Sequence, residues 1–234
     1  MTTTEKMNPK KTARLAGLLY LLLAIVATYG VMYVPSKIIV WDDAAATANN
    51  ILVNEFLFRT GIVGSLISQV IMILVVWLLY QLLKQVNELH AKLMGALVIV
   101  AIPIGFLLNV FKITALVIFK GGILQSFEPD QMHDLAELFL RIGSYGTQMV
   151  QLYWGLWLFP FGLLVYKSGF IPRVFGVLIF MNGIAYNILS FTFLLFPEYR
   201  SLVSQFAMPF VFLGEIPIIF WLLIKGVKSQ PITE

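Results

Sequence analysis

Five charged side chains lie within or at the edge of long apolar stretches of this sequence, where a charge needs a partner or a wet cavity. They are Arg59, Lys112, Glu137, Arg141 and Glu215. A charged side chain at the centre of a membrane helix costs about 2.5 to 3.5 kcal/mol on insertion scales, so such residues are retained for packing or for binding. With three bases against two acids, an anionic or amphipathic ligand is the better match. These five residues are therefore the first candidates for a binding site.

The two arginines each follow a glutamate at a spacing of four residues, Glu55 before Arg59 and Glu137 before Arg141. On a helix, an acid four residues ahead of a base is the favoured order for an ion pair on one face. We expect both pairs to form and to neutralise their own charges in part. The alternative for Arg59 is that its guanidinium extends to the membrane interface.

Lys112 and Glu215 have no partner at this spacing, and they could pair across the bundle if their helices face each other. The alternative is that the charges form interhelical bridges that only specify packing. Neutral side chains at deeper levels offer further hydrogen bonds: Gln69, Asn109, Gln148, Gln151, Asn182 and Asn187. Together with the charges, they predict a polar pocket that opens to the outer face.

Catalytic patterns are absent from the sequence. It has no cysteine, which excludes disulfides, thiolate catalysis and Cys-ligated metal sites. The two histidines, His90 and His133, are expected at solvated loop positions on opposite membrane faces, roughly 30 Å apart, where they cannot share a metal or haem. H-E-x-x-H, G-x-S-x-G and phosphate-binding glycine loops do not occur. No catalytic residue, metal or cofactor is predicted, and the sequence argues against an enzyme without deciding the question.

Apolar runs long enough to cross a bilayer must position these side chains. The chain has 234 residues, of which 59% are hydrophobic and 12% charged, whereas soluble domains have about 25% charged residues. A membrane helix needs about 20 apolar residues. Six runs reach that length: 15–34, 56–83, 93–119, 138–166, 174–196 and 202–224. The sequence therefore predicts an all-α membrane protein, a six-helix transmembrane bundle forming a single domain over 1–234.

Several local signals refine this bundle. The longest predicted outer loop is 35–55, where Asp42 and Asp43 precede an alanine-rich stretch and are typical of the N-cap of a short surface helix. Prolines within the runs should kink the third, fourth and sixth helices; they are Pro103, Pro160, Pro209 and Pro217. The tryptophans are expected to anchor at lipid-facing or interfacial positions: Trp77, Trp154, Trp157 and Trp221.

Basic residues gather on one side of the predicted membrane topology. They lie near the chain ends, in the connection between the second and third predicted helices, and in the connection between the fourth and fifth. These residues are Lys6, Lys10, Lys11, Arg14, Lys84, Lys92, Lys167, Arg173, Lys225 and Lys228. By the positive-inside rule this side, with both termini, is cytoplasmic. The formal net charge of +4 follows from these anchors, so no nucleic-acid partner is expected.

The first, third and fifth predicted helices run from the cytoplasmic face to the outer face. Each begins with a basic residue, a glycine three residues later and a leucine two residues after the glycine. The glycines are Gly17, Gly95 and Gly176. This pattern indicates three helical hairpin repeats. The alternative is that cytoplasmic ends need basic anchors and helix contacts need small residues, without any internal duplication.

Three longer motifs resemble a known family. They are Thr47-Ala48-Asn49-Asn50-Ile51 followed by Asn54, Glu55 and Arg59; Gly155-Leu-Trp157-Leu-Phe-Pro160-Phe-Gly162; and Ser168-Gly169-Phe-Ile-Pro172-Arg173 with Gly176. The chain from Lys11 to Lys228 resembles an uncharacterised bacterial membrane family, domain of unknown function 4386 (DUF4386). The resemblance implies a multi-pass protein of the bacterial cytoplasmic (inner) membrane and brings no activity with it.

Three hypotheses about function remain at this point. The leading one is the binding, sensing or transport of a small anionic or lipid-like molecule in the outer half of the bundle. The second is a structural or assembly subunit, because small residues allow close helix approach, and this also leaves room for a homo-oligomer; the residues are Gly61, Gly64, Gly143 and Gly146. The third is an integral membrane enzyme acting on lipid. In each case the lipid bilayer is the expected partner.

Overall fold

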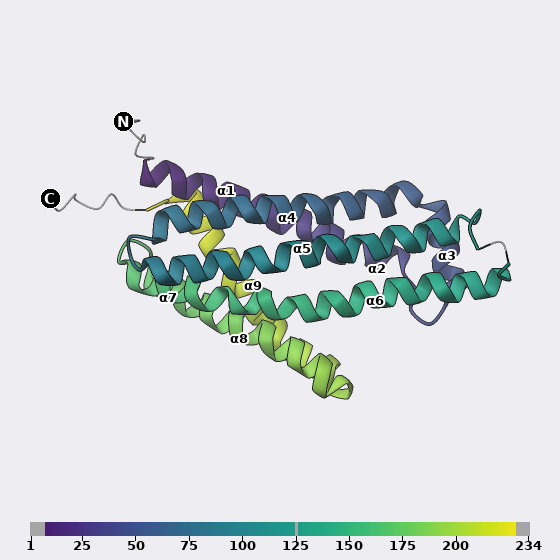
Figure 1. Cartoon of the computed structure of the whole chain (residues 1–234). Coiled ribbons are helices and arrows are strands. Elements are labelled where there is room, and N and C mark those ends of the chain that lie inside the picture. The colour runs from purple at the N-terminus through teal and green to yellow at the C-terminus, as the bar shows by residue number, and fades with distance from the viewer. Residues whose placement is uncertain (1–7, 125, 228–234) are drawn as a thin grey trace. The chain divides into compact units, whose positions relative to one another are not determined.

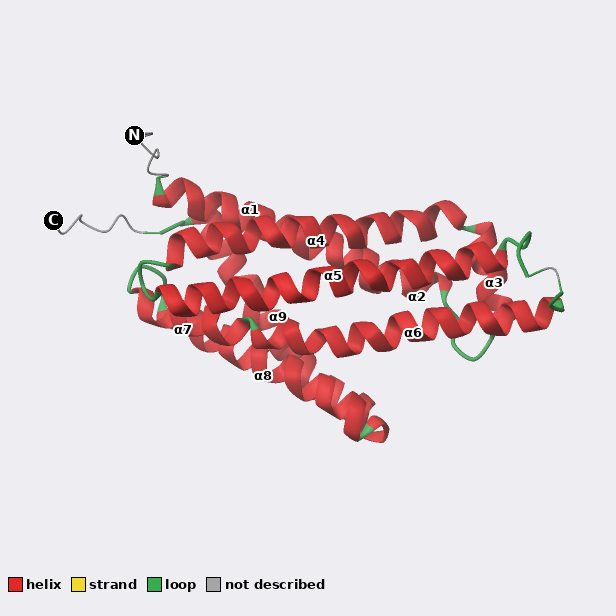
Figure 2. Ribbon diagram, in the orientation of Figure 1, coloured by secondary structure: helices red, strands yellow, loops and turns green. Residues whose placement is uncertain are grey.

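The computed structural model describes residues 8–124 and 126–227 of the chain (Figure 1). These residues form helices joined by short loops and no strand (Figure 2). Six of the helical stretches are long and apolar enough to cross a membrane. The prediction of an all-α membrane protein with six spans is confirmed. The predicted anchors Lys6 and Lys228 lie outside the described residues.

The first span runs over Pro9–Ile38. It consists of α1 (Pro9–Thr28), a π-helical turn (Tyr29–Tyr33) and α2 (Val34–Ile38). The helix starts six residues before the apolar run because Asn8 caps it, accepting a hydrogen bond from the backbone N–H of Lys10 over 3.0 Å. Polar residues thus extend the helix beyond the part that hydrophobicity detects.

The predicted surface helix is α3 (Ala44–Val53). A side-chain oxygen of Asp43 accepts a hydrogen bond from the backbone N–H of Ala46 over 2.8 Å, so the predicted aspartate cap is confirmed. The second and third spans are α4 (Glu55–Leu83) and α5 (Glu88–Phe119). Asn54 alone separates α3 from α4.

The fourth span is divided into α6 (Pro129–Leu156) and α7 (Leu158–Ser168). The division lies at Trp157, three residues before Pro160, which has no N–H to donate to the carbonyl of Leu156. Trp157 was expected at the lipid or interface, and this is wrong, because its side chain is 3% exposed. It stacks on Phe161 with 5.2 Å between ring centroids.

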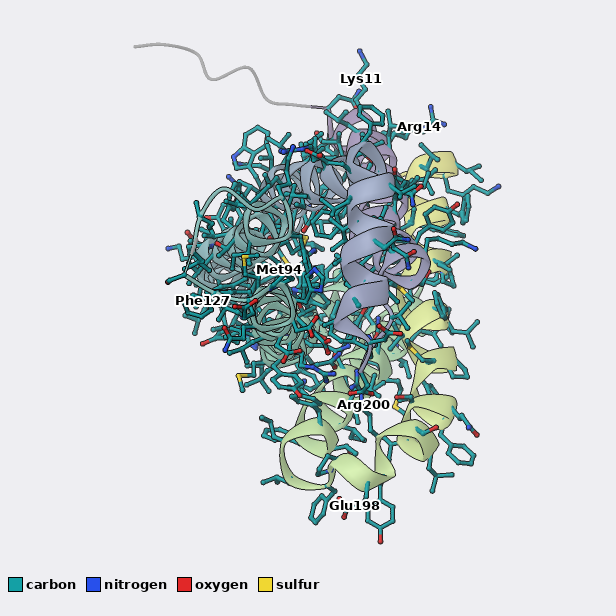
Figure 3. The ribbon with its side chains drawn as sticks, turned by 90° about the vertical axis from the view of Figure 1, so that its right-hand side faces the viewer. Lys11, Arg14, Met94, Phe127, Glu198 and Arg200 are labelled. Atoms are coloured by element: carbon teal, nitrogen blue, oxygen red, sulfur yellow. The ribbon has the colours of Figure 1, made fainter. Side chains whose placement is uncertain are left out.

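The last two spans contain α8 (Arg173–Leu195) and α9 (Arg200–Ile224), joined by a short 3₁₀ turn (Pro197–Tyr199). Pro209 and Pro217 lie inside α9 and Pro103 lies inside α5, and these helices continue through them. Helix α8 packs against both α7 and α9. In Figure 3, Glu198 and Arg200 mark the tip of the α8 and α9 hairpin, away from Lys11 and Arg14 on α1.

The chain forms two compact units, each described here by itself. Unit 1 contains 1–22, 71–101 and 151–234, and unit 2 contains 23–70 and 102–150. The core of unit 2 is apolar and joins α2, α3, α4, α5 and α6 through residues such as Ile38, Ile51 and Leu116. The single domain predicted over 1–234 stays a prediction.

The three repeated glycines all lie in unit 1. A Cβ at Gly176 would lie 2.7 Å from the Gly162 carbonyl oxygen on α7, and one at Gly17 would lie 2.9 Å from the Leu222 carbonyl carbon on α9. At Gly95 the nearest atom would be 4.0 Å away, on Val76. The shared glycine therefore permits close backbone packing at two of its three positions. The three-hairpin repeat itself stays a prediction.

Candidate functional site

Unit 2 contains two clusters of charged side chains, of which the first is the Glu55 triad, formed by Glu55, Arg59 and Lys120. Arg59 Nε lies 2.8 Å from Glu55 Oε1, which is the predicted pair within α4. Lys120, directly after α5, lies 3.0 Å from Glu55 Oε2. One carboxylate thus joins the start of α4 to the end of α5. The Arg59 side chain is half exposed, so solvent screens this cluster.

The second cluster is the Arg141 triad, formed by Asp42, Glu137 and Arg141. Arg141 Nε donates to Glu137 over 2.8 Å within α6, as the spacing predicted. Its Nη2 atom lies 2.6 Å from Asp42 in the loop before α3. The guanidinium also lies over the Trp41 ring, 5.3 Å from its centroid. The Glu137 side chain is only 10% exposed, whereas that of Asp42 is 86% exposed, so the Arg141–Glu137 pair is the less hydrated part of this cluster.

The five intramembrane charges alone are three bases and two acids. The two triads change this balance, because each adds a partner from a connecting segment. The Glu55 triad has two bases and one acid, and the Arg141 triad has two acids and one base, so their formal charges cancel. Lys120 and Asp42 were missed as partners because both lie in connecting segments. Arg59 and Arg141 are therefore engaged by acids of the chain, and the case for an anionic ligand depends on Lys112.

Lys112 lies on α5 next to the α4–α5 polar layer, which we define as Ser65, Gln69, Gly105 and Asn109. The amide of Asn109 donates to Ser65 Oγ over 3.1 Å and to the Gly105 carbonyl over 2.8 Å. A Cβ at Gly105 would lie 2.7 Å from Gln69 Nε2, so glycine is what lets this amide approach α5. The structure brings two predicted residues, Gln69 and Asn109, to this layer, and Lys112 follows Asn109 by three positions on α5.

Two polar groups of this region have no partner within the described part of unit 2. The half-buried Lys112 ammonium forms no ion pair with a described residue of the unit. The Asn109 side-chain oxygen is buried and accepts no hydrogen bond. A buried acceptor without a donor is costly unless a bound molecule supplies one. A positive charge and an unused acceptor thus lie about one helical turn apart.

Glu215 lies in unit 1, where it forms the Glu215 site with Tyr20 and Asn182. The Tyr20 hydroxyl donates to Glu215 Oε2, and the Asn182 amide donates to Glu215 Oε1 over 2.8 Å and to the Val211 carbonyl over 3.3 Å. Tyr20 and Asn182 are buried, and Glu215 is half-buried. This site joins α1, α8 and α9. The pairing of Glu215 with Lys112 stays a prediction, because these residues lie in different units.

The remaining predicted amides are distributed over both units. Gln148 is half-buried on the unit 2 part of α6. Asn187 on α8 donates to the Gly183 carbonyl over 2.7 Å, and its amide carbon would lie 3.0 Å from a Cβ at Gly155 on α6. The side-chain oxygens of Gln151 and Asn187 are buried without a described partner. Asn187 lies at the α6 and α8 contact in unit 1, and Gln151 precedes Gly155 by four positions on α6.

Both histidines differ from the solvated loop positions that were expected. His133 lies inside α6, half-buried, with its ring 6.0 Å from the Phe119 ring. His90 lies in the first turn of α5, where its ring nitrogen and the Asn87 side-chain oxygen are 2.8 Å apart. Both helices begin several residues before the apolar runs, so His90 and His133 lie within helices and not in loops. Within the described ranges, no group of three or more His, Asp or Glu side chains could hold a metal ion.

Comparison with known proteins places the whole membrane region in one family. The chain matches the family model described as "Domain of unknown function (DUF4386)" over residues 15–226. A protein of Archaeoglobus fulgidus, described as uncharacterized, is 32% identical over 131 residues, which are 56% of this chain and 70% of that protein. No solved structure matches the chain.

Proposed function

This chain belongs to the family described as domain of unknown function DUF4386, and we propose that it binds a small anionic or amphipathic molecule at Lys112 and senses or transports it. The observation that carries this proposal is the half-buried Lys112 ammonium, which has no ion pair within the described part of unit 2. An ammonium removed from water without a counter-charge is unfavourable. An anionic group beside Lys112 would supply that charge.

The α4–α5 polar layer narrows the chemistry of the ligand. The buried Asn109 oxygen, three residues before Lys112, accepts no hydrogen bond. A ligand with a hydroxyl or amide donor next to its anionic group could pair with the Lys112 ammonium and donate a hydrogen bond to the Asn109 oxygen at the same time. The apolar surface of the spans would accommodate an acyl chain. This combination describes an anionic lipid headgroup or a similar amphipathic molecule.

We assign the site to the outer half of a bacterial cytoplasmic membrane, with both termini in the cytoplasm. The support is the excess of Lys and Arg near the chain ends and in the segments 84–92 and 167–173. Lys112 lies in the C-terminal half of α5, which begins on that basic side. On this topology, Lys112 faces the outer leaflet.

The experiment compares the full chain with Lys112→Ala in nanodiscs of phosphatidylcholine, with phosphatidylglycerol added as the anionic lipid and inorganic phosphate as the free anion. We expect a saturable rise in the melting temperature of the unmodified chain with one of these probes, and loss of the rise in Lys112→Ala. Lys92→Ala is the matched control, because Lys92 is exposed and paired with Glu88. An equal response of Lys112→Ala and the unmodified chain would contradict the proposal.

The assembly hypothesis is less well supported than it was from the sequence. The four glycines that motivated it contact other parts of unit 2. Cβ atoms at Gly61 and Gly64 would meet Val34 and Tyr29, and those at Gly143 and Gly146 would meet Leu108. The close helix approach that these glycines allow is therefore to other helices of the same chain. We do not favour an enzyme acting on lipid, because the contacts among residues 8–124 and 126–227 provide no catalytic set of side chains.

A further inference from the structure

We propose that the Glu215 site binds a monovalent metal cation. This inference concerns unit 1 and does not depend on the function proposed for Lys112. Its starting point is the carboxylate of Glu215, whose two oxygens face the Tyr20 hydroxyl and the Asn182 amide. Both partners donate hydrogen bonds to it, and an ionised carboxylate accepts such bonds.

In its ionised form, this carboxylate has no counter-charge in the described part of unit 1. Within the described part of unit 1, no lysine, arginine or histidine lies within 4.0 Å of Glu215. Two neutral donors lower the cost of the charge without cancelling it, and an uncompensated charge inside a membrane protein is strongly unfavourable. One positive charge taken up from solution would balance it.

Two neutral oxygen atoms of residues at this site, one on Asn182 and one on Leu213, are candidate ligands for a metal cation. The Asn182 side chain is fully buried, and its oxygen accepts no hydrogen bond. Both atoms that its nitrogen approaches, Val211 O and Glu215 Oε1, are acceptors, which fixes the orientation of the amide. The carbonyl of Leu213 also lacks a helical donor, because Pro217 has no N–H. Carbonyls freed by a broken helical bond are typical cation ligands in membrane proteins.

The same residues favour a monovalent ion over a multivalent one. Glu215 supplies one negative charge, and no group of three His, Asp or Glu residues occurs in the described residues. Gly214 adjoins the carboxylate, and a Cβ there would lie 2.8 Å from the Asn182 amide nitrogen. Glycine at this position is what allows the Asn182 amide to reach α9. The Glu215 carboxylate and the Asn182 amide thus meet at a close contact between α8 and α9.

The test measures the melting temperature of the full chain in phosphatidylcholine nanodiscs, in lithium, sodium, potassium or choline chloride at constant pH and ionic strength. We expect a saturable rise with at least one alkali cation over choline, and its loss in Glu215→Gln. Glu88→Gln is the matched control, because Glu88 is exposed and already paired with Lys92; it should keep the response.

Two further variants keep the test decisive if Glu215→Gln does not fold. Glu215→Asp and Asn182→Ala should each shift the cation midpoint to at least tenfold higher concentration. Equal melting temperatures in alkali and choline salts would overturn the proposal. So would an unchanged response in these variants. A melting temperature that varied with pH but not with the alkali cation would assign the balancing charge to a proton and would overturn the metal site as well.

Discussion

The side-chain amide of Asn182 on α8 donates a hydrogen bond to Glu215 on α9 over 2.8 Å. This bond lies where the two helices approach closely at Gly214. Tyr20 from α1 donates to the other carboxylate oxygen. A single carboxylate therefore links three helices of unit 1, and its removal should weaken the packing of all three helices.

Tyr20→Phe should destabilise the chain without changing its fold. The substitution removes the donor to Glu215 and leaves the buried ring in place. Hydrogen bonds to charged groups contribute about 1.5 to 3 kcal/mol. We expect a loss of that size in the free energy of unfolding, measured by denaturant titration in detergent. Tyr199→Phe is the control, because the Tyr199 side chain is 54% exposed; an equal loss in both variants would contradict the assignment.

The glycine contacts predict different outcomes for one substitution at two positions that share the sequence pattern. Gly176→Ala should destabilise the α7 and α8 contact by about 1 to 3 kcal/mol, because the new methyl group would overpack against backbone atoms. Its Cβ would lie 2.7 Å from the Gly162 carbonyl oxygen. Gly95→Ala meets no atom closer than 4.0 Å and should be neutral or slightly stabilising. Melting temperatures of the two variants decide this, and similar losses in both would refute it.

The sequence predicted those features that depend on local order along the chain. The six spans follow from apolar runs, and the pairing of Glu137 with Arg141 follows from a spacing of four. The partners contributed by distant segments could not be predicted. Tyr20 and Glu215 are 195 positions apart, and their contact depends on how each helix is rotated. Helices that are apolar on every side carry little information about that rotation.

The two ion-pair clusters should differ in how strongly they respond to the loss of an acid. Glu137→Gln should cost about 1 to 3 kcal/mol, because the partly buried Arg141 loses one of its two acids. Glu55→Gln should have a smaller effect, since Arg59 and Lys120 are both about half exposed and water can solvate them. Urea titrations of the two variants would show this order, and the reverse order would contradict it.

The proposed topology predicts which introduced cysteines can be labelled from outside an intact cell. Because the chain has no cysteine, a single substitution supplies the only thiol. Ser126 is exposed between α5 and α6, and Gln85 is exposed between α4 and α5, so Ser126→Cys and Gln85→Cys place the thiol at accessible positions.

A membrane-impermeant maleimide should label Ser126→Cys in whole cells, and Gln85→Cys only after the membrane is opened. The reason is that Gln85 lies between Lys84 and Lys92, on the side where basic residues gather. Labelling in opened membranes is the control for thiol reactivity in both variants. The opposite pattern would place the termini outside and Lys112 in the inner leaflet. The ligand proposed for Lys112 would then have to reach it from the cytoplasmic side.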